Sequence, residues 1–139
     1  MSHIADISAA VVAALNGHQF TKPFVAVRTY RPLYDLEEMS TLRVTVVAKG
    51  VALEMADRTR TRMDVRIDIG VQKKIGSDAE IDEMMSLVEE IADFVRDLEL
   101  ESCAALWTRT ENQPIYAPDH MAELGVFTGV LTLSFRVVR

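Results

Sequence analysis

The clearest pattern along the chain is an alternation of charged and apolar residues in RMDVRIDIGVQKK, residues 62 to 74. Every odd position from Met63 to Val71 is apolar, and a two-residue period of this kind predicts a β-strand with one face in the core. Arginines continue the even positions back to Arg58, which is too long for one ordinary strand. We therefore expect a hairpin turn or flexible loop around Asp57 to Thr61.

Four further segments have strand-like patterns. The segment from Phe24 to Pro32 is rich in β-formers, but the prolines that bracket it favour a short strand near a sheet edge. The segment from Leu42 to Lys49 alternates, and Gly50 after it predicts a turn or a bulge. Two later strands are expected over residues 103–110 and 127–139.

Two segments have the 3.6-residue period of amphipathic helices. The first opens the chain and ends at Asn16-Gly17, a common helix stop. The second starts at a capping box formed by Ser77 and Glu80 and is expected to run to about Leu98. A turn of helix over residues 119–124 and a loop or helical turn over residues 33–39 complete the expected elements.

The order of these elements indicates the fold class. Only one helix lies between candidate strands, which argues against a doubly wound parallel sheet. We expect an α+β fold, with an antiparallel or mixed β-sheet packed against two main α-helices in a single domain over residues 1–139.

Charge and cysteine content narrow the function classes. The net charge of −6 makes nucleic-acid binding over the whole surface unfavourable, although a local basic stripe remains compatible with it. Cys103 is the one cysteine, the first 17 residues do not resemble a signal peptide, and no apolar run is long enough for a membrane span. We expect a protein of the reducing cytoplasm.

No pattern predicts a catalytic centre, a cofactor site or a metal site. The Asp119-His120 pair has no serine or cysteine in a nucleophile setting to accompany it, and the histidines are scattered. The six glycines are isolated, so there is neither a phosphate loop nor a dinucleotide fingerprint. The expectation is a binding protein without a cofactor rather than an enzyme.

Two charged regions are the candidate interface. One region has arginines at every second position from 58 to 62 with no acidic residue between them, followed by an arginine at 66 between the aspartates at 64 and 68. The other region is the polar face of the second helix. For the arginines, the interpretation as a solvent-exposed hairpin tip and the interpretation as a docking surface for an acidic neighbour have equal weight. For the helix, a solvated face is favoured over a binding surface for a basic partner. The candidate residues are Arg58, Arg60, Arg62, Arg66, Glu89, Glu90 and Asp93.

Most of the chain after residue 20 resembles a known family. The resemblance lies in the segments LRVTVVAKGVALEMADR, DVRIDIGVQKK, EIDEMMSLVEEIADF, NQPIYAPDHM and VFTGVLTLSFRVVR. They are similar to the tail terminator proteins of long-tailed bacteriophages and prophages, the siphophage proteins of the minor tail protein U type.

The resemblance implies a structural virion protein of the tail and neck, assembled in the bacterial host cytoplasm. Its implied partners are copies of itself in a ring of six, the major tail tube protein and the head connector or neck proteins, and phage DNA would pass through the ring lumen without sequence-specific recognition. Such a ring caps the tube and ends its polymerisation. Another head-to-tail joining or head-completion neck protein, or a cytoplasmic ligand-binding α+β module, remains an alternative.

Overall fold

The computed structural model describes residues 3–29, 41–96, 98–100, 103–113 and 115–139, and confirms the α+β fold. The loop or helical turn expected over residues 33–39 lies outside the described residues. The helices are α1 (His3–Gly17), α2 (Asp78–Val95) and α3 (Pro118–Leu124). The strands are β1 (Ala26–Arg28), β2 (Arg43–Met55), β3 (Thr61–Lys74), β4 (Glu99–Leu100), β5 (Ala105–Glu111) and β6 (Val126–Val138).

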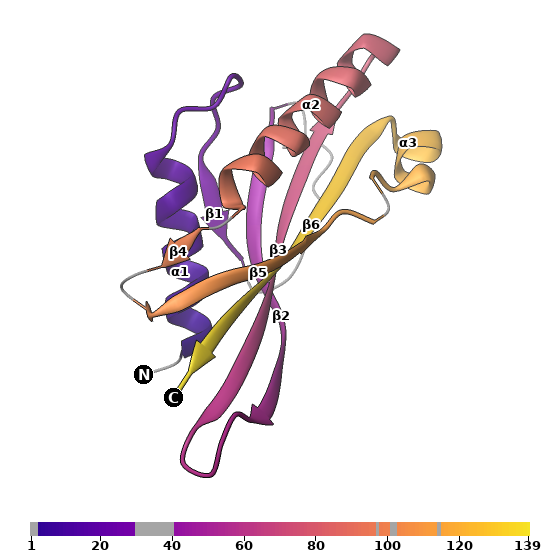
Figure 1. Ribbon diagram of the computed structural model, residues 1–139. Helices are drawn as coiled ribbons and strands as arrows, with labels where there is room; N and C mark the ends of the chain where they lie inside the picture. The colour runs from indigo at the N-terminus through magenta and orange to yellow at the C-terminus, as the bar shows by residue number, and fades with distance from the viewer. Residues whose placement is uncertain (1–2, 30–40, 97, 101–102, 114) are drawn as a thin grey trace.

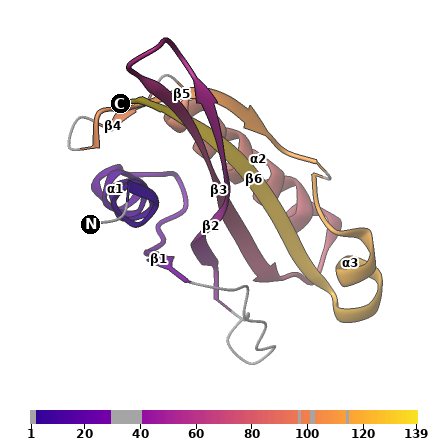
Figure 2. The same ribbon diagram turned by 90° about the horizontal axis from the view of Figure 1, so that it is seen from below.

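The strands form one mixed sheet in the order β1-β2-β3-β6-β5-β4. The β1–β2 pair is parallel and the other pairs are antiparallel. Both main helices pack on the same face of the twisted sheet, here called the helix-side face (Figure 1, Figure 2). The opposite face, called the open face, carries the even positions of β3.

The alternation in β3 sets which side chains reach the core. The apolar odd positions from Met63 to Val71 are each no more than 4% exposed. They meet the odd positions of β6, whose largest members Phe127 and Phe135 are fully buried. Fully burying one such side chain contributes about 1.5–3 kcal/mol, so this face fixes the strand register. The residues that α1 and α2 add to this core are Ile7, Val11, Leu15, Met84, Leu87, Val88, Ile91 and Val95.

Helix α1 ends where the sequence predicts, and its end is tied to the first strand. The Asn16 side chain accepts a hydrogen bond from the Ala26 backbone N–H at 2.8 Å and donates one to the Ala26 carbonyl at 3.1 Å. These bonds hold β1 at the sheet edge. The edge position expected from the bracketing prolines is confirmed.

Helix α2 begins at the predicted cap. The Ser77 hydroxyl accepts from the Glu80 N–H at 3.4 Å, and the Glu80 carboxylate accepts from the Gly76 N–H at 2.9 Å. The predicted end at Leu98 is wrong, because Arg96 already has an extended backbone (φ −61°, ψ 130°). Leu98 packs against the core from beyond the helix, so its apolar character extends the pattern past the last helical residue.

Strand β2 contains the bulge that Gly50 predicted. Its register against β3 shifts between Ala48 and Gly50, so one extra residue lies on β2. Before the bulge, Val44 and Val46 face the helix side; after it, Val51 faces the same side opposite Val65. The predicted turn follows, and the β2–β3 hairpin extends beyond the helices at the bottom of Figure 1.

The segment between α2 and β6 differs from prediction in two places. Strand β4 was not expected, and the strand predicted from Cys103 begins at Ala105 instead. Ala104 before it has a positive φ of 51°, which no continuous strand residue adopts. The predicted short helix over residues 119–124 is confirmed as α3. None of the described helices is both long and apolar enough to span a membrane.

Candidate interaction surfaces

The sequence-predicted charged residues lie on different elements of the fold. The arginines are in the β2–β3 turn and the first half of β3, and this hairpin lies at the bottom of Figure 1, whereas the acidic residues are in the second half of α2, a helix that crosses the upper part of the view. In the view from below, the hairpin tip is nearest and α2 lies behind the sheet (Figure 2). The fold therefore separates the two candidate patches rather than joining them in one site.

Asp57 organises the hairpin turn. One oxygen of its carboxylate accepts from the backbone N–H groups of Thr59 and Arg60, both at 2.9 Å, and the other accepts from the Arg60 Nε–H at 2.8 Å. The bond from the Thr59 N–H, followed by the Arg60 side chain, holds the pKa of this carboxyl below its usual value. The turn is thus built on an ionised aspartate.

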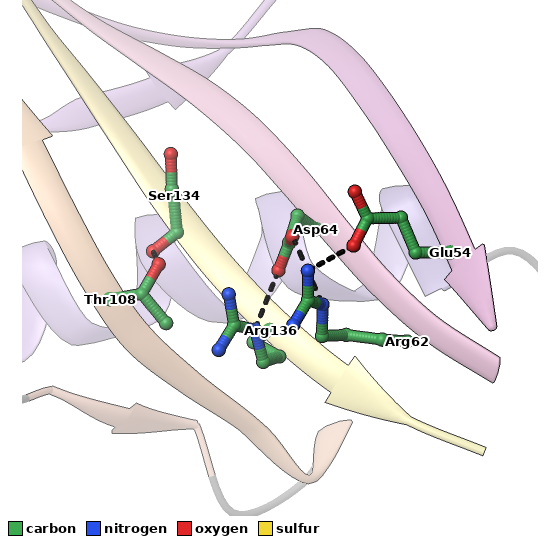
Figure 3. Close-up of polar contacts among 6 residues, drawn as sticks. All are labelled: Glu54, Arg62, Asp64, Thr108, Ser134 and Arg136. Carbon is green, nitrogen blue, oxygen red and sulfur yellow. Dashed lines mark hydrogen bonds and ion pairs between the residues drawn. The ribbon is translucent and has the colours of Figure 1, made fainter. Parts of the chain in front are cut away.

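A ladder of alternating charges crosses the open face next to this turn (Figure 3). We call Glu54, Arg62, Asp64 and Arg136 the charged ladder. The Arg62 guanidinium pairs with Glu54 on β2 and lies 3.7 Å from the Asp64 carboxylate. The same carboxylate accepts from the Arg136 Nε–H on β6 at 2.9 Å, so the ladder links three strands.

The expectation of an uncompensated arginine run is wrong for Arg60 and Arg62. Arg60 pairs with Asp57 in the turn, and Arg62 pairs with Glu54 on the facing strand. The spacing of charges along β3 alone predicts neither pair. Register places Glu54 directly opposite Arg62. Arg58 is exposed, and no ion pair joins it to any described residue.

Arg66 lies on the open face, in a shallow hollow of about 290 Å³ that also contains Arg109, Arg136 and Asp64. Its side chain is exposed and forms no ion pair within the described ranges. Two hydroxyls line the same hollow, and Thr108 donates its hydrogen bond to the Ser134 carbonyl at 3.2 Å. Figure 3 shows this bond beside the charged ladder. The hollow is polar, open and net positive.

The acidic candidates on α2 are not equivalent. Glu90 accepts hydrogen bonds from the N–H of Thr21 at 2.9 Å and from its hydroxyl at 3.3 Å, so this carboxylate holds the loop after α1. Glu89 and Asp93 are exposed, with no ion pair to the part of the chain that the structure describes. Of the three, these two are the carboxylates available to a partner.

An exposed apolar strip on β2 was missed by the sequence reasoning. Val51, Leu53 and Met55 follow the bulge on the helix-side face, and their exposed fractions rise toward the tip from 45% to 56% and 79%. We call these three residues the apolar strip. Large exposed apolar groups rimmed by charges are typical of protein interfaces. The sequence signal for this strip was the alternation of apolar residues in VALEM, residues 51–55, after Gly50. These side chains are exposed because the hairpin extends beyond the helices.

The outer edge of the same strand is largely unpaired. Strand β1 pairs with Val44 to Val46 only, extended by one bond from the Thr29 N–H to the Val46 carbonyl at 2.9 Å. Beyond Val46, no described residue pairs with β2 on that side. Unpaired strand edges are templates for pairing with another chain.

The described residues contain no group of three or more His, Cys, Asp or Glu side chains placed to hold a metal ion. Cys103, the one cysteine of the sequence, is half-buried and packs against the core. The candidate surfaces of the described residues are therefore exposed charges, the apolar strip and the unpaired part of the β2 edge.

Comparison with known proteins shows a structural likeness without a sequence match. No family model and no curated protein matches the chain. Among solved structures, the chain is similar to the sheath/tube terminator of an extracellular contractile injection system, PVC, in its extended state. The TM-score is 0.52 at 16% identity, and the match covers 98% of this chain and 56% of the other. The chain thus spans little more than half of that neighbour, with which it shares a fold.

Proposed function

We propose that this protein terminates a tail tube. In this proposal, copies of the chain form a ring on the last ring of the tube, stop its polymerisation and offer the free face of the ring to the head connector. The observation that carries the proposal is the likeness of almost the whole chain, 98% of it, to a sheath/tube terminator. The resemblance of the sequence to siphophage tail terminators supports the same role.

The neighbour belongs to a contractile system with a sheath, whereas the sequence resembles terminators of siphophage tails. Tube termination is common to both, and the proposal takes only that. Placement in the tail or neck of a virion, a ring of six and a lumen that passes DNA are further parts of the proposal that follow from the resemblance.

The separation of the charged patches supports a head-to-tail ring. In such a ring each subunit uses two different surfaces, and each surface meets the other kind on its neighbour. The exposed carboxylates Glu89 and Asp93 lie in the second half of α2, whereas the exposed Arg58 and Arg66 lie in the β2–β3 turn and on β3. This arrangement leaves the two patches free to face different neighbours.

The direct test is tube growth. Purified tube protein of the same virus is polymerised with and without this chain, and tube lengths are measured by electron microscopy. The proposal predicts shorter tubes with density at one end only, at a ratio of about one ring per tube. Unchanged tube lengths together with binding to the portal side of the head would contradict it and favour the head-completion alternative.

A matched pair of variants tests the charged patches. The triple reversal Arg58→Glu, Arg60→Glu and Arg62→Glu is compared with the single reversal Arg58→Glu. Because Arg60 and Arg62 have partners within the hairpin, the triple variant also disturbs the turn, whereas Arg58→Glu changes only an exposed charge. Loss of tube capping in Arg58→Glu assigns that residue to the interface; unchanged capping in both variants removes the arginines from it.

A further inference from the structure

Among the described residues, each side of the sheet has an edge that is largely unpaired. Strand β1 covers three residues of β2, and strand β4 covers two residues of β5. The outer edges of Val47–Met55 and of Thr108–Glu111 therefore pair with no described strand, apart from the end bonds of β1 and β4. A chain that carries two different free edges has the parts for a heterologous, repeating contact with copies of itself.

The two edge strands run in opposite directions. Each neighbouring pair from β2 through β3 and β6 to β5 is antiparallel, so β2 and β5 are antiparallel to each other. If the next subunit continues the sheet, its β5 meets β2 as an antiparallel neighbour. This is the more stable of the two pairings per residue.

The side chains at the two edges are complementary in this direction. On the open face, β2 carries Lys49 and then Glu54, with side chains 48% and 62% exposed, whereas β5 carries Arg109 and then Glu111, 71% and 48% exposed. Antiparallel pairing with Glu54 opposite Arg109 puts Lys49 on the Glu111 side of that pair. Parallel pairing with the same two residues opposed would put Lys49 on the other side, away from Glu111, so the opposite charges favour the antiparallel direction.

The helix-side face supplies an apolar match. Trp107 lies opposite Phe135 on this face of β5 and is only half-buried, and Thr110 lies on the same face opposite Leu133. The bulge between Trp107 and Arg109 places two β5 residues against one partner residue. When Glu54 is set opposite Arg109, Leu53 lies opposite Thr110 and Met55 meets Trp107.

We propose that the β2 edge of one subunit pairs with the β5 edge of the next copy of this chain, and that this contact covers the apolar strip. The inference rests on the proposed ring and names its subunit interface. In this interface, apolar contacts and backbone hydrogen bonds between the two edge strands hold the subunits together. The charges on the open face favour the antiparallel direction of the two strands. In a ring, copies of the same chain would cover both unpaired edges of every subunit.

Cysteine cross-linking tests the contact. In a Cys103→Ser background, the double variant Leu53→Cys/Thr110→Cys should give a ladder of covalent multimers on mild oxidation or with a short bis-maleimide. Each single variant should stay monomeric on a denaturing gel, and a mixture of the two singles should give dimers. Glu54→Cys/Arg109→Cys, on the open face, should give the same ladder if loss of the Thr110 hydroxyl disturbs the first pair.

The control pair is Ser86→Cys/Thr110→Cys, because Ser86 is exposed and lies on α2, which is part of neither edge strand; it should give no ladder. Self-cross-linking of Leu53→Cys alone would replace the inference with a symmetric β2–β2 contact. If neither double variant gives a ladder while native mass measurement shows a ring, the interface assignment is wrong and the proposed function stands. If the unmodified chain forms no ring, alone or on tube ends, the proposed function itself is wrong.

Discussion

At the residue scale, the main finding is that charges with the same sequence spacing have different surroundings. Arg60 and Arg62 are paired by the turn and by the facing strand, whereas Arg58 is exposed without an ion pair to the described residues. Exposed ion pairs contribute little to stability, with a median of about 0–1 kcal/mol. Their effect here is to shape the turn and the open face rather than to hold the fold.

The turn should respond to Asp57 and to pH. Asp57→Ala should raise amide exchange at Thr59 and Arg60, because both N–H groups lose their acceptor. Asp57→Asn is the control, since its side-chain oxygen still accepts these bonds while the charge on Arg60 loses its partner. It should raise exchange less than Asp57→Ala does.

The pH dependence follows from the lowered pKa of Asp57. The folded hairpin favours the ionised form, so its contribution to hairpin stability is present above the usual value of 3.8 and is lost as the pH falls through the lowered value. An acid titration followed by NMR at the Thr59 and Arg60 amides should show the turn loosening only below pH 3.8. A midpoint above that value would contradict this account of the turn.

At the element scale, backbone irregularities position the surfaces. The bulge at Lys49 keeps the apolar side chains of β2 on one face, and the hairpin then carries them past the helices. The end of α3 is a second such point. There Gly125 has a φ of +62° and donates its N–H to the Met121 carbonyl at 3.2 Å. Glycine adopts this left-handed conformation without the cost that a side chain adds.

Gly125→Ala should therefore lower the free energy of unfolding by about 1–2 kcal/mol, the cost of a left-handed conformation for an ordinary residue. Gly17→Ala at the end of α1 is the matched control, because its new Cβ would meet nothing within 4 Å and its φ is not in the left-handed region. Chemical denaturation of both variants measures the difference. Equal stability would mean that the Gly125 conformation relaxes without cost.

At the scale of the whole molecule, the two kinds of surface suggest different behaviour in salt. Contacts between exposed charges weaken as the screening length falls from about 10 Å at 0.1 M to about 3 Å at 1 M ionic strength. Burial of apolar side chains does not weaken in this way. The inferred interface contains both, with the apolar strip and the strand edge as its centre.

We therefore expect self-association to persist at high salt and to depend on the apolar strip. Leu53→Asp should reduce the oligomer fraction strongly at every salt concentration, whereas Arg58→Glu should change it mainly at low salt. Native mass measurement across a salt series provides the comparison. Dissociation of the unmodified protein at high salt would instead favour the charged patches as the main contact.

The candidate site was predictable only where it depends on local pattern. The acidic face of α2 and the position of the hairpin followed from periodicity and from the excess strand length. The partner of Arg62 was not predictable, because Glu54 lies on the neighbouring strand and is opposite Arg62 only in the register that the buried faces of β2 and β3 set. The exposure of Leu53 did not follow either, because its apolar character alone is typical of a core residue.

The sequence by itself determined the kinds of element other than β4, and the starts of α2, β3 and β6, because hydrophobic period and capping residues act within a few residues. It also determined the helix-side face of β3. The tertiary structure decided the strand order, the pairing of the arginines and the exposure of the apolar strip. These depend on which strands meet and on how far the helices extend along the sheet, and both are settled by packing between segments distant in the chain.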